Sequence, residues 1–244
     1  MKKELEQFLQ ENINKDVKGL NALSAVKVLE KNYELYDEYF FEYFKAIKKK
    51  NDHGNNVLDV GCGVGNISTK LHSLGFNVVG VDYLKEAINI AKKDATGVDF
   101  QVANVYNLPF PNEKFDVIVC LGVFQTVAEP EKALIELFRV LKKEGIIILR
   151  TINSISITSF KVKRHQFFTL YNPFKLKKML KEAGGYNVEV KGIYLMPKSL
   201  EYIQEIILSS KIYKALNFLF PLTCFLSHSF YIQAYKKAGK RDFF

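Results

Sequence analysis

The chain has 244 residues, of which 48% are hydrophobic, enough for one α/β domain with a full core. Its 35 Lys and Arg residues outnumber 26 Asp and Glu, for a formal net charge of +9, yet the lysines are spread along the chain and arginines are few, which disfavours nucleic-acid readout. The three cysteines are scattered and form no C-x-x-C pair, so the sequence predicts no metal site. The N-terminus lacks the apolar core of a signal peptide, and with the few cysteines this predicts a reducing, cytoplasmic location.

The first 50 residues are predicted to be helical, with helices at 4–14, 20–31 and 32–50. In the third of these, aromatic residues recur at helical spacing: Tyr33, Tyr36, Tyr39, Phe40 and Tyr43. Such a stripe fits packing against the rest of the domain and fits a lid over a bound ligand equally well. We therefore expect residues 1–50 to form an N-terminal helical cap.

Strands and helices alternate from residue 51 to residue 150. Strands are predicted at 56–60, 76–81, 98–102, 115–120 and 145–150, and helices at 65–74, 85–93 and 131–142. Pro130 suits the start of the last of these helices. Alternation with short connections predicts right-handed crossovers and a parallel sheet that is covered on both faces.

The second half of the chain, 151–244, begins with an irregular polar stretch. A helix at 173–183, a strand at 187–195, a helical insertion at 197–227 and a last strand at 230–235 are predicted to follow. Residues 215–235 carry no charge and are numerous enough to span a membrane. Their polar side chains and Pro221 favour a helix, a break and a strand instead, while peripheral contact with a membrane stays open.

The most informative stretch is Val57–Asn66. An apolar run ends in Asp59 and is followed by glycines at alternate positions, 61, 63 and 65. This pattern predicts a buried strand that feeds a tight turn, with a backbone that comes close to a ligand. A second apolar run ends in Asp82, and a carboxylate at the tip of the second strand suits the hydroxyls of a ribose.

The spacing differs from the dinucleotide fingerprint G-x-G-x-x-G, because Asn66 holds the place of its third glycine. Asp59 would also repel a pyrophosphate, whereas it could pair with a cationic amino group, directly or through water. S-adenosylmethionine has an α-amino group, a ribose and an adenine, and it has no phosphate. Val57–Asn66 resembles motif I of the class I S-adenosylmethionine-dependent methyltransferases.

Further motifs of that family follow in order, so the resemblance covers roughly residues 35–195. The similar segments are 79–83, 100–105, 108–120, 121–127 and 133–149. The resemblance implies a Rossmann-like three-layer sandwich of α/β class, with a seven-stranded, mostly parallel sheet and an antiparallel last strand. It implies a single domain over 1–244, in which 51–150 is the cofactor-binding core and 151–244 the substrate side.

The resemblance also implies S-adenosyl-L-methionine as cofactor and S-adenosyl-L-homocysteine as product. In the family, Asp82 would bind the ribose and Tyr83 would lie beside the adenine. Asn104 stands where an acid usually accepts a hydrogen bond from the adenine amino group, a bond that an amide oxygen can also accept. The full set of implied cofactor contacts is Asp59, Gly61, Cys62, Gly63, Asn66, Asp82, Tyr83, Asn104, Val105 and Leu121.

Methyl transfer from a sulfonium is an in-line displacement, so it needs a base only if the acceptor must lose a proton. Gln125 and Thr126 replace the Glu-His pair of the family, so the chemistry of that histidine is absent. His165 is the candidate general base, or else it anchors its loop. Candidate acceptor contacts are Gln125, Thr126, Arg150 and His228, each of which also fits a purely structural role.

The sequence therefore predicts a methyltransferase for a small-molecule acceptor, apolar or anionic, with transfer to a hydroxyl oxygen. It resembles the quinone-biosynthesis and natural-product branches of the family. N- or C-methylation is the alternative. A nucleic-acid methyltransferase is disfavoured because the segment after the fourth strand lacks an N-P-P-Y or D-P-P-Y motif. A non-catalytic cofactor-binding module is the least favoured hypothesis, and the oligomeric state is not indicated.

Overall fold

The computed structural model describes residues 7, 40–41, 44–45, 54–157, 168–193, 215 and 218–238. The elements in chain order are β1 (Asn56–Val60), α3 (Asn66–Ser73), β2 (Asn77–Asp82), α4 (Lys85–Asp94), β3 (Asp99–Val102), β4 (Phe115–Leu121), η1 (Phe124–Thr126), α5 (Pro130–Val140), β5 (Leu141–Ile152), α6 (Pro173–Glu182), β6 (Gly185–Ile193), α9 (Phe220–Thr223), η5 (Cys224–Leu226) and β7 (Ser229–Lys236). Most of the helical segment predicted at 1–50, and most of the predicted insertion at 197–227, lie outside the described residues.

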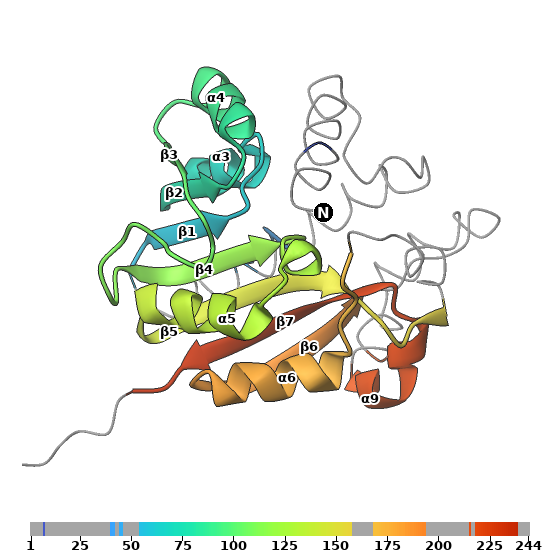
Figure 1. Cartoon of the computed structure of the whole chain (residues 1–244). Coiled ribbons are helices and arrows are strands. Elements are labelled where there is room, and N and C mark those ends of the chain that lie inside the picture. The colour runs from blue at the N-terminus through green and yellow to red at the C-terminus, as the bar shows by residue number, and fades with distance from the viewer. Residues whose placement is uncertain are drawn as a thin grey trace, which may run out of the picture.

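The strands form one seven-stranded sheet in the order β3-β2-β1-β4-β5-β7-β6 (Figure 1). Neighbours from β3 to β5 are parallel, and β7 is antiparallel to both β5 and β6. This confirms the predicted fold, including the antiparallel last strand beside β5. The chain runs outward from β1 in one direction through β2 and β3, and in the other through β4 and β5. The carboxyl ends of β1 and β4 therefore flank the switch point at which open α/β sheets bind ligands.

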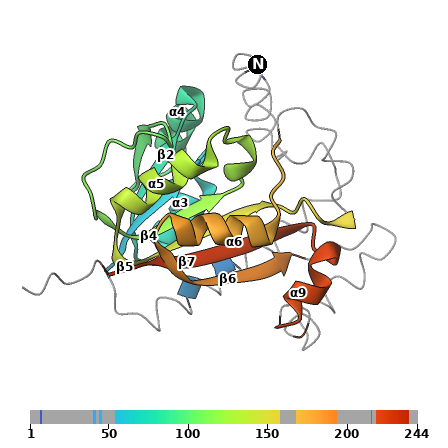
Figure 2. The same cartoon turned by 60° about the horizontal axis from the view of Figure 1, so that its bottom comes forward.

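Both faces of the sheet are covered, because successive strand residues enter different hydrophobic clusters. Leu58 and Ile118 pack in a cluster with residues of α5 and α6. Their neighbours Val57 and Val117 pack in a second cluster with Leu71 of α3 and with Phe40, Phe41 and Phe44. Figures 1 and 2 show α5 and α6 lying over the same face of the sheet. The arrangement is the three-layer sandwich that the sequence predicts.

Several element boundaries differ from the prediction, most of all where α5 meets β5. The helix expected at 131–142 ends at Val140, because Leu141 already pairs with Phe115 at the start of β5. That strand also continues to Ile152, where it pairs with Ser229 of β7, so it is longer than the predicted 145–150. Local patterning does not reveal such pairing with a distant strand.

The described helices include none with the length and apolar character needed to cross a membrane.

Candidate active site

The turn after β1 depends on glycine at its first position. Gly61 has a φ of 73°, and a Cβ there would lie 1.9 Å from Cγ2 of Val123. The Gly61 and Cys62 N–H groups both donate to the Val81 carbonyl oxygen, at 2.7 and 3.0 Å. Backbone hydrogen bonds therefore fix the turn against the end of β2, and the Val123 side chain leaves no room for a side chain at position 61.

Gly63 occupies a different environment in the same turn. Its φ is 56°, but a Cβ there would meet nothing within 4 Å, so the backbone borders open space. Its N–H donates to Oδ2 of Asp82 at 2.9 Å, and the Leu84 N–H donates to Oδ1 at 2.9 Å. The Asp82 carboxylate is thus fixed between two loops at the carboxyl edge of the sheet.

Each Asp82 oxygen retains acceptor capacity beyond these two bonds. Burial raises the pKa of this carboxyl, against the opposing effect of the hydrogen bonds from Leu84 and Gly63. The site thus places a partly buried carboxylate, with spare lone pairs, beside the open backbone at Gly63. Such a group can accept hydrogen bonds from neighbouring hydroxyls of a bound sugar.

Asp59 is the second acid of the site and is only 3% exposed. Ser68, on α3, donates its hydroxyl hydrogen to Oδ2 of Asp59 at 2.6 Å. Burial raises the Asp59 pKa to about 7, and repulsion from Asp82 adds to this while the Ser68 bond opposes it. A buried carboxyl near its pKa at neutral pH, beside a second acid, is stabilised as an anion when a cation binds nearby.

The loop after β3 places Asn104 at the same edge of the sheet. Its side-chain oxygen accepts from the Tyr106 N–H at 3.0 Å, and its backbone oxygen accepts from the Asn107 N–H at 2.9 Å. Because a backbone N–H can only donate, it identifies the amide atom that faces it as the oxygen. That oxygen keeps a second lone pair, and Asn104 is exposed.

The remaining cofactor candidates surround these groups. Tyr83 follows Asp82 directly and is 43% exposed, whereas Val105 and Leu121 are half-buried. Asn66 is the first residue of α3 and is exposed. Burial raises the pKa of the Cys62 thiol, which favours its neutral form.

The turn after β4 brings Gln125 and Arg150 together. A Cβ at Gly122 would lie 3.6 Å from Nε2 of Gln125 and 3.9 Å from Nη2 of Arg150, so both nitrogens flank one spot. Gln125 is 5% exposed, and its Oε1 accepts no hydrogen bond from the part of the chain that the structure describes. Thr126 differs, because its hydroxyl donates to the Val123 carbonyl at 2.8 Å and so caps the turn.

Two buried hydroxyls that the sequence did not single out belong to the end of β5 and the segment beside it. The hydroxyl oxygens of Thr151 and Tyr171 have no hydrogen-bond partner among the described residues. Tyr171 is placed by backbone bonds to Ile152 and Ser154, and its ring packs edge-on against Phe124 at 6.0 Å between centroids. No motif indicates these residues, since their position follows from the path of the chain after β5.

His228 lies at the same edge of the sheet, just before β7. Its N–H donates to the Ile193 carbonyl at 2.9 Å, and its carbonyl accepts from the Asn153 N–H at 3.0 Å. Burial lowers the imidazole pKa to about 4, so the ring is neutral at pH 7 and is a weak base. His165 lies outside the described residues. Within the described ranges, no three His, Cys, Asp or Glu side chains gather as a metal site would require.

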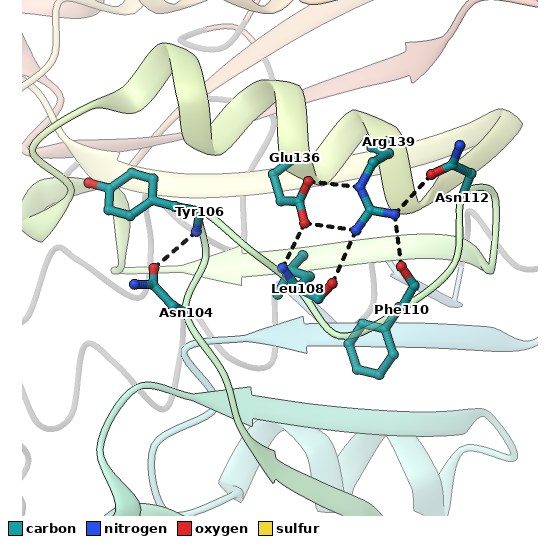
Figure 3. Close-up of polar contacts among 7 residues, drawn as sticks. All are labelled: Asn104, Tyr106, Leu108, Phe110, Asn112, Glu136 and Arg139. Atoms are coloured by element: carbon teal, nitrogen blue, oxygen red, sulfur yellow. Dashed lines mark hydrogen bonds and ion pairs between the residues drawn. The ribbon is translucent and has the colours of Figure 1, made fainter.

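Sequence reasoning also missed a polar network between α5 and the loop that follows Asn104 (Figure 3). Glu136 and Arg139 form an ion pair on α5, with Nη2 to Oε1 at 2.7 Å, and both bind the loop backbone. Their spacing of three residues on a predicted helix is a signal for the pair itself. It gives no indication of the loop that the pair holds.

Comparison with known proteins identifies the family of this chain. A family model described as a methyltransferase domain matches residues 51–212. Ubiquinone biosynthesis O-methyltransferase of Rickettsia canadensis is 30% identical over 176 residues, which are 63% of this chain and 74% of that protein. Ubiquinone/menaquinone biosynthesis C-methyltransferase of Campylobacter jejuni is 28% identical over 153 residues, which are 59% of this chain and 62% of that protein. The matched region therefore falls short of the full length of these relatives.

Solved structures share the fold at low sequence identity. A SAM-dependent methyltransferase from Archaeoglobus fulgidus superposes with a TM-score of 0.62 at 16% identity, covering 83% of this chain and 94% of that one. Phosphoethanolamine N-methyltransferase 2 of Haemonchus contortus, solved in complex with S-adenosyl-L-methionine, gives a TM-score of 0.56 at 19% identity over 76% of this chain and 49% of that one. Together with the glycine turn and its two acids, these matches show that the chain belongs to the class I S-adenosylmethionine-dependent methyltransferase family.

Proposed function

We propose that this chain transfers the methyl group of S-adenosyl-L-methionine to a hydroxyl oxygen of a small-molecule acceptor, as a single domain in the cytoplasm. The observation that carries the proposal is the pair of acids, Asp59 and Asp82, on either side of a glycine turn with open space at Gly63. Two carboxylates there suit a cationic donor with a sugar and would repel a phosphorylated nucleotide. The three described cysteines are free thiols, which supports a reducing compartment.

In this proposal Asp82 accepts hydrogen bonds from the ribose hydroxyls, and its fixed position between Gly63 and Leu84 pre-organises it for that role. Asp59 faces the amino group of the methionine portion, directly or through water. Asn104 accepts from the adenine amino group with its second lone pair. The other proposed contacts are Gly61, Cys62, Asn66, Tyr83, Val105 and Leu121.

The acceptor is proposed to lie near Gln125 and Arg150, where their nitrogens flank the same spot. Donors of this kind orient an oxygen-bearing or anionic acceptor. Thr126 and His228 complete the proposed acceptor side, although the capping bond of Thr126 and the low pKa of His228 favour orienting roles for both. A quinone precursor of the kind named for the Rickettsia and Campylobacter relatives is an acceptor of this description.

The reaction joins the acceptor oxygen to the methyl carbon while the carbon–sulfur bond breaks and leaves its electron pair on sulfur. The hydroxyl proton must pass to a base, and His165 is our candidate. Because transfer to oxygen and transfer to carbon both occur among the named relatives, oxygen is the finer part of the proposal. It is supported by the Rickettsia relative, whose match covers the larger share of both chains.

The test combines binding with product analysis. Isothermal titration calorimetry with S-adenosyl-L-homocysteine should show binding to the wild type, and Asp82→Asn should weaken it, as loss of a charge-assisted bond does, by about 1.5–3 kcal/mol. Asp99→Asn is the matched control, because Asp99 is exposed at the opposite end of neighbouring β3. Incubation with methyl-labelled cofactor and catechol or hydroquinone acceptors, followed by NMR of the product, should show an O-methyl group. Absence of binding at millimolar ligand would refute the cofactor assignment, and a C-methyl product would refute the choice of oxygen.

A further inference from the structure

The loop between β3 and β4 is held at two separate points, one directly before α5 and one on α5 itself. At the first, the Tyr106 hydroxyl oxygen accepts hydrogen bonds from the Ala128 and Glu129 N–H groups, at 2.9 and 3.1 Å. These two amides directly precede α5, and they follow the turn that carries Gln125. The backbone N–H of Tyr106 meanwhile donates to the side-chain oxygen of Asn104. One residue thus contacts both the start of α5 and the Asn104 side chain.

The second point is the Glu136–Arg139 pair (Figure 3). All five N–H donors of the Arg139 guanidinium are used: Nε and one Nη2 hydrogen bind Glu136, the other Nη2 hydrogen binds the Leu108 carbonyl at 3.1 Å, and Nη1 binds the Phe110 carbonyl at 2.8 Å and Oδ1 of Asn112 at 2.9 Å. Oε1 of Glu136 accepts from the Leu108 N–H at 2.6 Å. The two side chains therefore bind both N–H and C=O groups of the loop backbone.

These hydrogen bonds add to the apolar packing of the loop against α5. Leu108 and Phe110 are buried in the same hydrophobic cluster as Leu134 and Leu137 of α5. Burial of these side chains alone would keep the loop on the helix, without fixing the backbone upstream of Leu108. The directional bonds of Tyr106, Glu136 and Arg139 define the position of the turn at residues 104–107 more narrowly than apolar contact can.

We propose that Tyr106 and the Glu136–Arg139 pair are positioning residues that aim the Asn104 amide oxygen at the adenine amino group of the cofactor. The inference rests on the proposed function, since it assumes that Asn104 faces the adenine. Because α5 follows the acceptor-side turn directly, the same helix fixes the adenine side and the acceptor side of the site. Selectivity for adenine then depends on residues that do not themselves touch it.

The test measures selectivity rather than affinity alone. S-adenosyl-L-homocysteine and its hypoxanthine analogue, S-inosyl-L-homocysteine, differ in one respect: the exocyclic amino group, a donor, is replaced by an oxygen, an acceptor. Calorimetry would compare both ligands on the wild type, Tyr106→Phe and Arg139→Lys. Tyr106→Phe removes only a hydroxyl whose partners are solvent-exposed. Arg139→Lys keeps the positive charge but loses the planar guanidinium with its five N–H donors. Lys178→Gln is the matched control, since it breaks an exposed ion pair with Glu182 on α6.

We expect Tyr106→Phe to weaken S-adenosyl-L-homocysteine binding by about 3- to 10-fold, the effect of one or two hydrogen bonds, with a smaller change for the hypoxanthine analogue. Arg139→Lys should act in the same direction, and Lys178→Gln should match the wild type. Unchanged selectivity in both loop variants would overturn the positioning role. This includes an equal loss of affinity for both ligands, which would indicate general loosening of the site. Failure of the wild type to bind either ligand would overturn the proposed function and this inference together.

Discussion

Replacing Asp59 by asparagine should make the protein more stable at alkaline pH while weakening its cofactor binding. Asp59 is 3% exposed, and its pKa is raised from 3.8 to about 7 by burial. The folded state therefore holds a proton at pH values where the unfolded chain has already lost it. The stabilisation that this proton confers is complete below pH 3.8 and is lost as the pH rises through about 7.

The size of the effect follows from the two pKa values. The folded and unfolded pKa values differ by about three units, which corresponds to a change of about 4 kcal/mol in the free energy of unfolding between acid and alkaline pH. Asparagine stays neutral throughout, and its oxygen can still accept the Ser68 hydroxyl hydrogen. Because its amide hydrogens need partners of their own in a buried place, we expect Asp59→Asn to gain only about 1–3 kcal/mol at pH 8.

The assay is urea unfolding followed by circular dichroism at pH 5, 6, 7 and 8, with the exposed-site variant Asp99→Asn as control. Wild type and control should lose stability across this range more steeply than Asp59→Asn. At pH 8 the same variant should bind S-adenosyl-L-homocysteine more weakly, because the ligand ammonium loses its carboxylate. A variant that is less stable than wild type at pH 8, with an unchanged pH slope, would refute the reasoning, since Asp59 would then be fully compensated as an anion in the empty site.

Three further predictions follow from the same geometry. A bound ammonium should favour ionised Asp59, so the affinity for S-adenosyl-L-homocysteine should fall as the pH drops below about 7. Below that pH, ligand binding should also release protons, which calorimetric titrations in buffers of different ionisation enthalpy would reveal. Gly63→Ala should weaken cofactor binding by placing a methyl in the open space, whereas Gly184→Ala, also at positive φ with nothing within 4 Å, should cost stability alone; equal binding by the two variants would exclude Gly63 from the site. Glu144 has a φ of 61° and accepts from the Tyr186 hydroxyl, so Glu144→Gly should be more stable than Glu144→Ala by about 1 kcal/mol in urea unfolding.

The sheet and its order of layers could be predicted from the sequence because they depend on local periodicity and on general rules of chain crossover. The turn at Gly61 and Gly63 was also predictable, since glycines at alternate positions after a buried apolar run are typical of a tight turn that borders a ligand. The start of β5 at Leu141 was not, because it is set by pairing with Phe115, a residue 26 positions earlier in the chain.

The candidate site could be proposed from the sequence to the extent that a single residue type carries the proposed role. Asp59 and Asp82 are of this kind, being acids at the ends of apolar runs. Ser68 and Tyr106 are not, because a serine in a helix and a tyrosine in a loop have many ordinary roles. Their partners, Asp59 and the amides before α5, are identified only when the chain has folded.

The place of β7 between β5 and β6 has a consequence for how the sheet is assembled. β6 leaves the ribosome before β7, yet among the described strands its one partner is β7. Until residues 229–236 arrive, the edges of β5 and β6 that β7 later covers stay unpaired, and such edges are the kind of surface that recruits foreign strands. Translation that stalls within this interval should expose the chain to chaperones and to aggregation, and completion of β7 covers the β5 edge and one edge of β6 in one step.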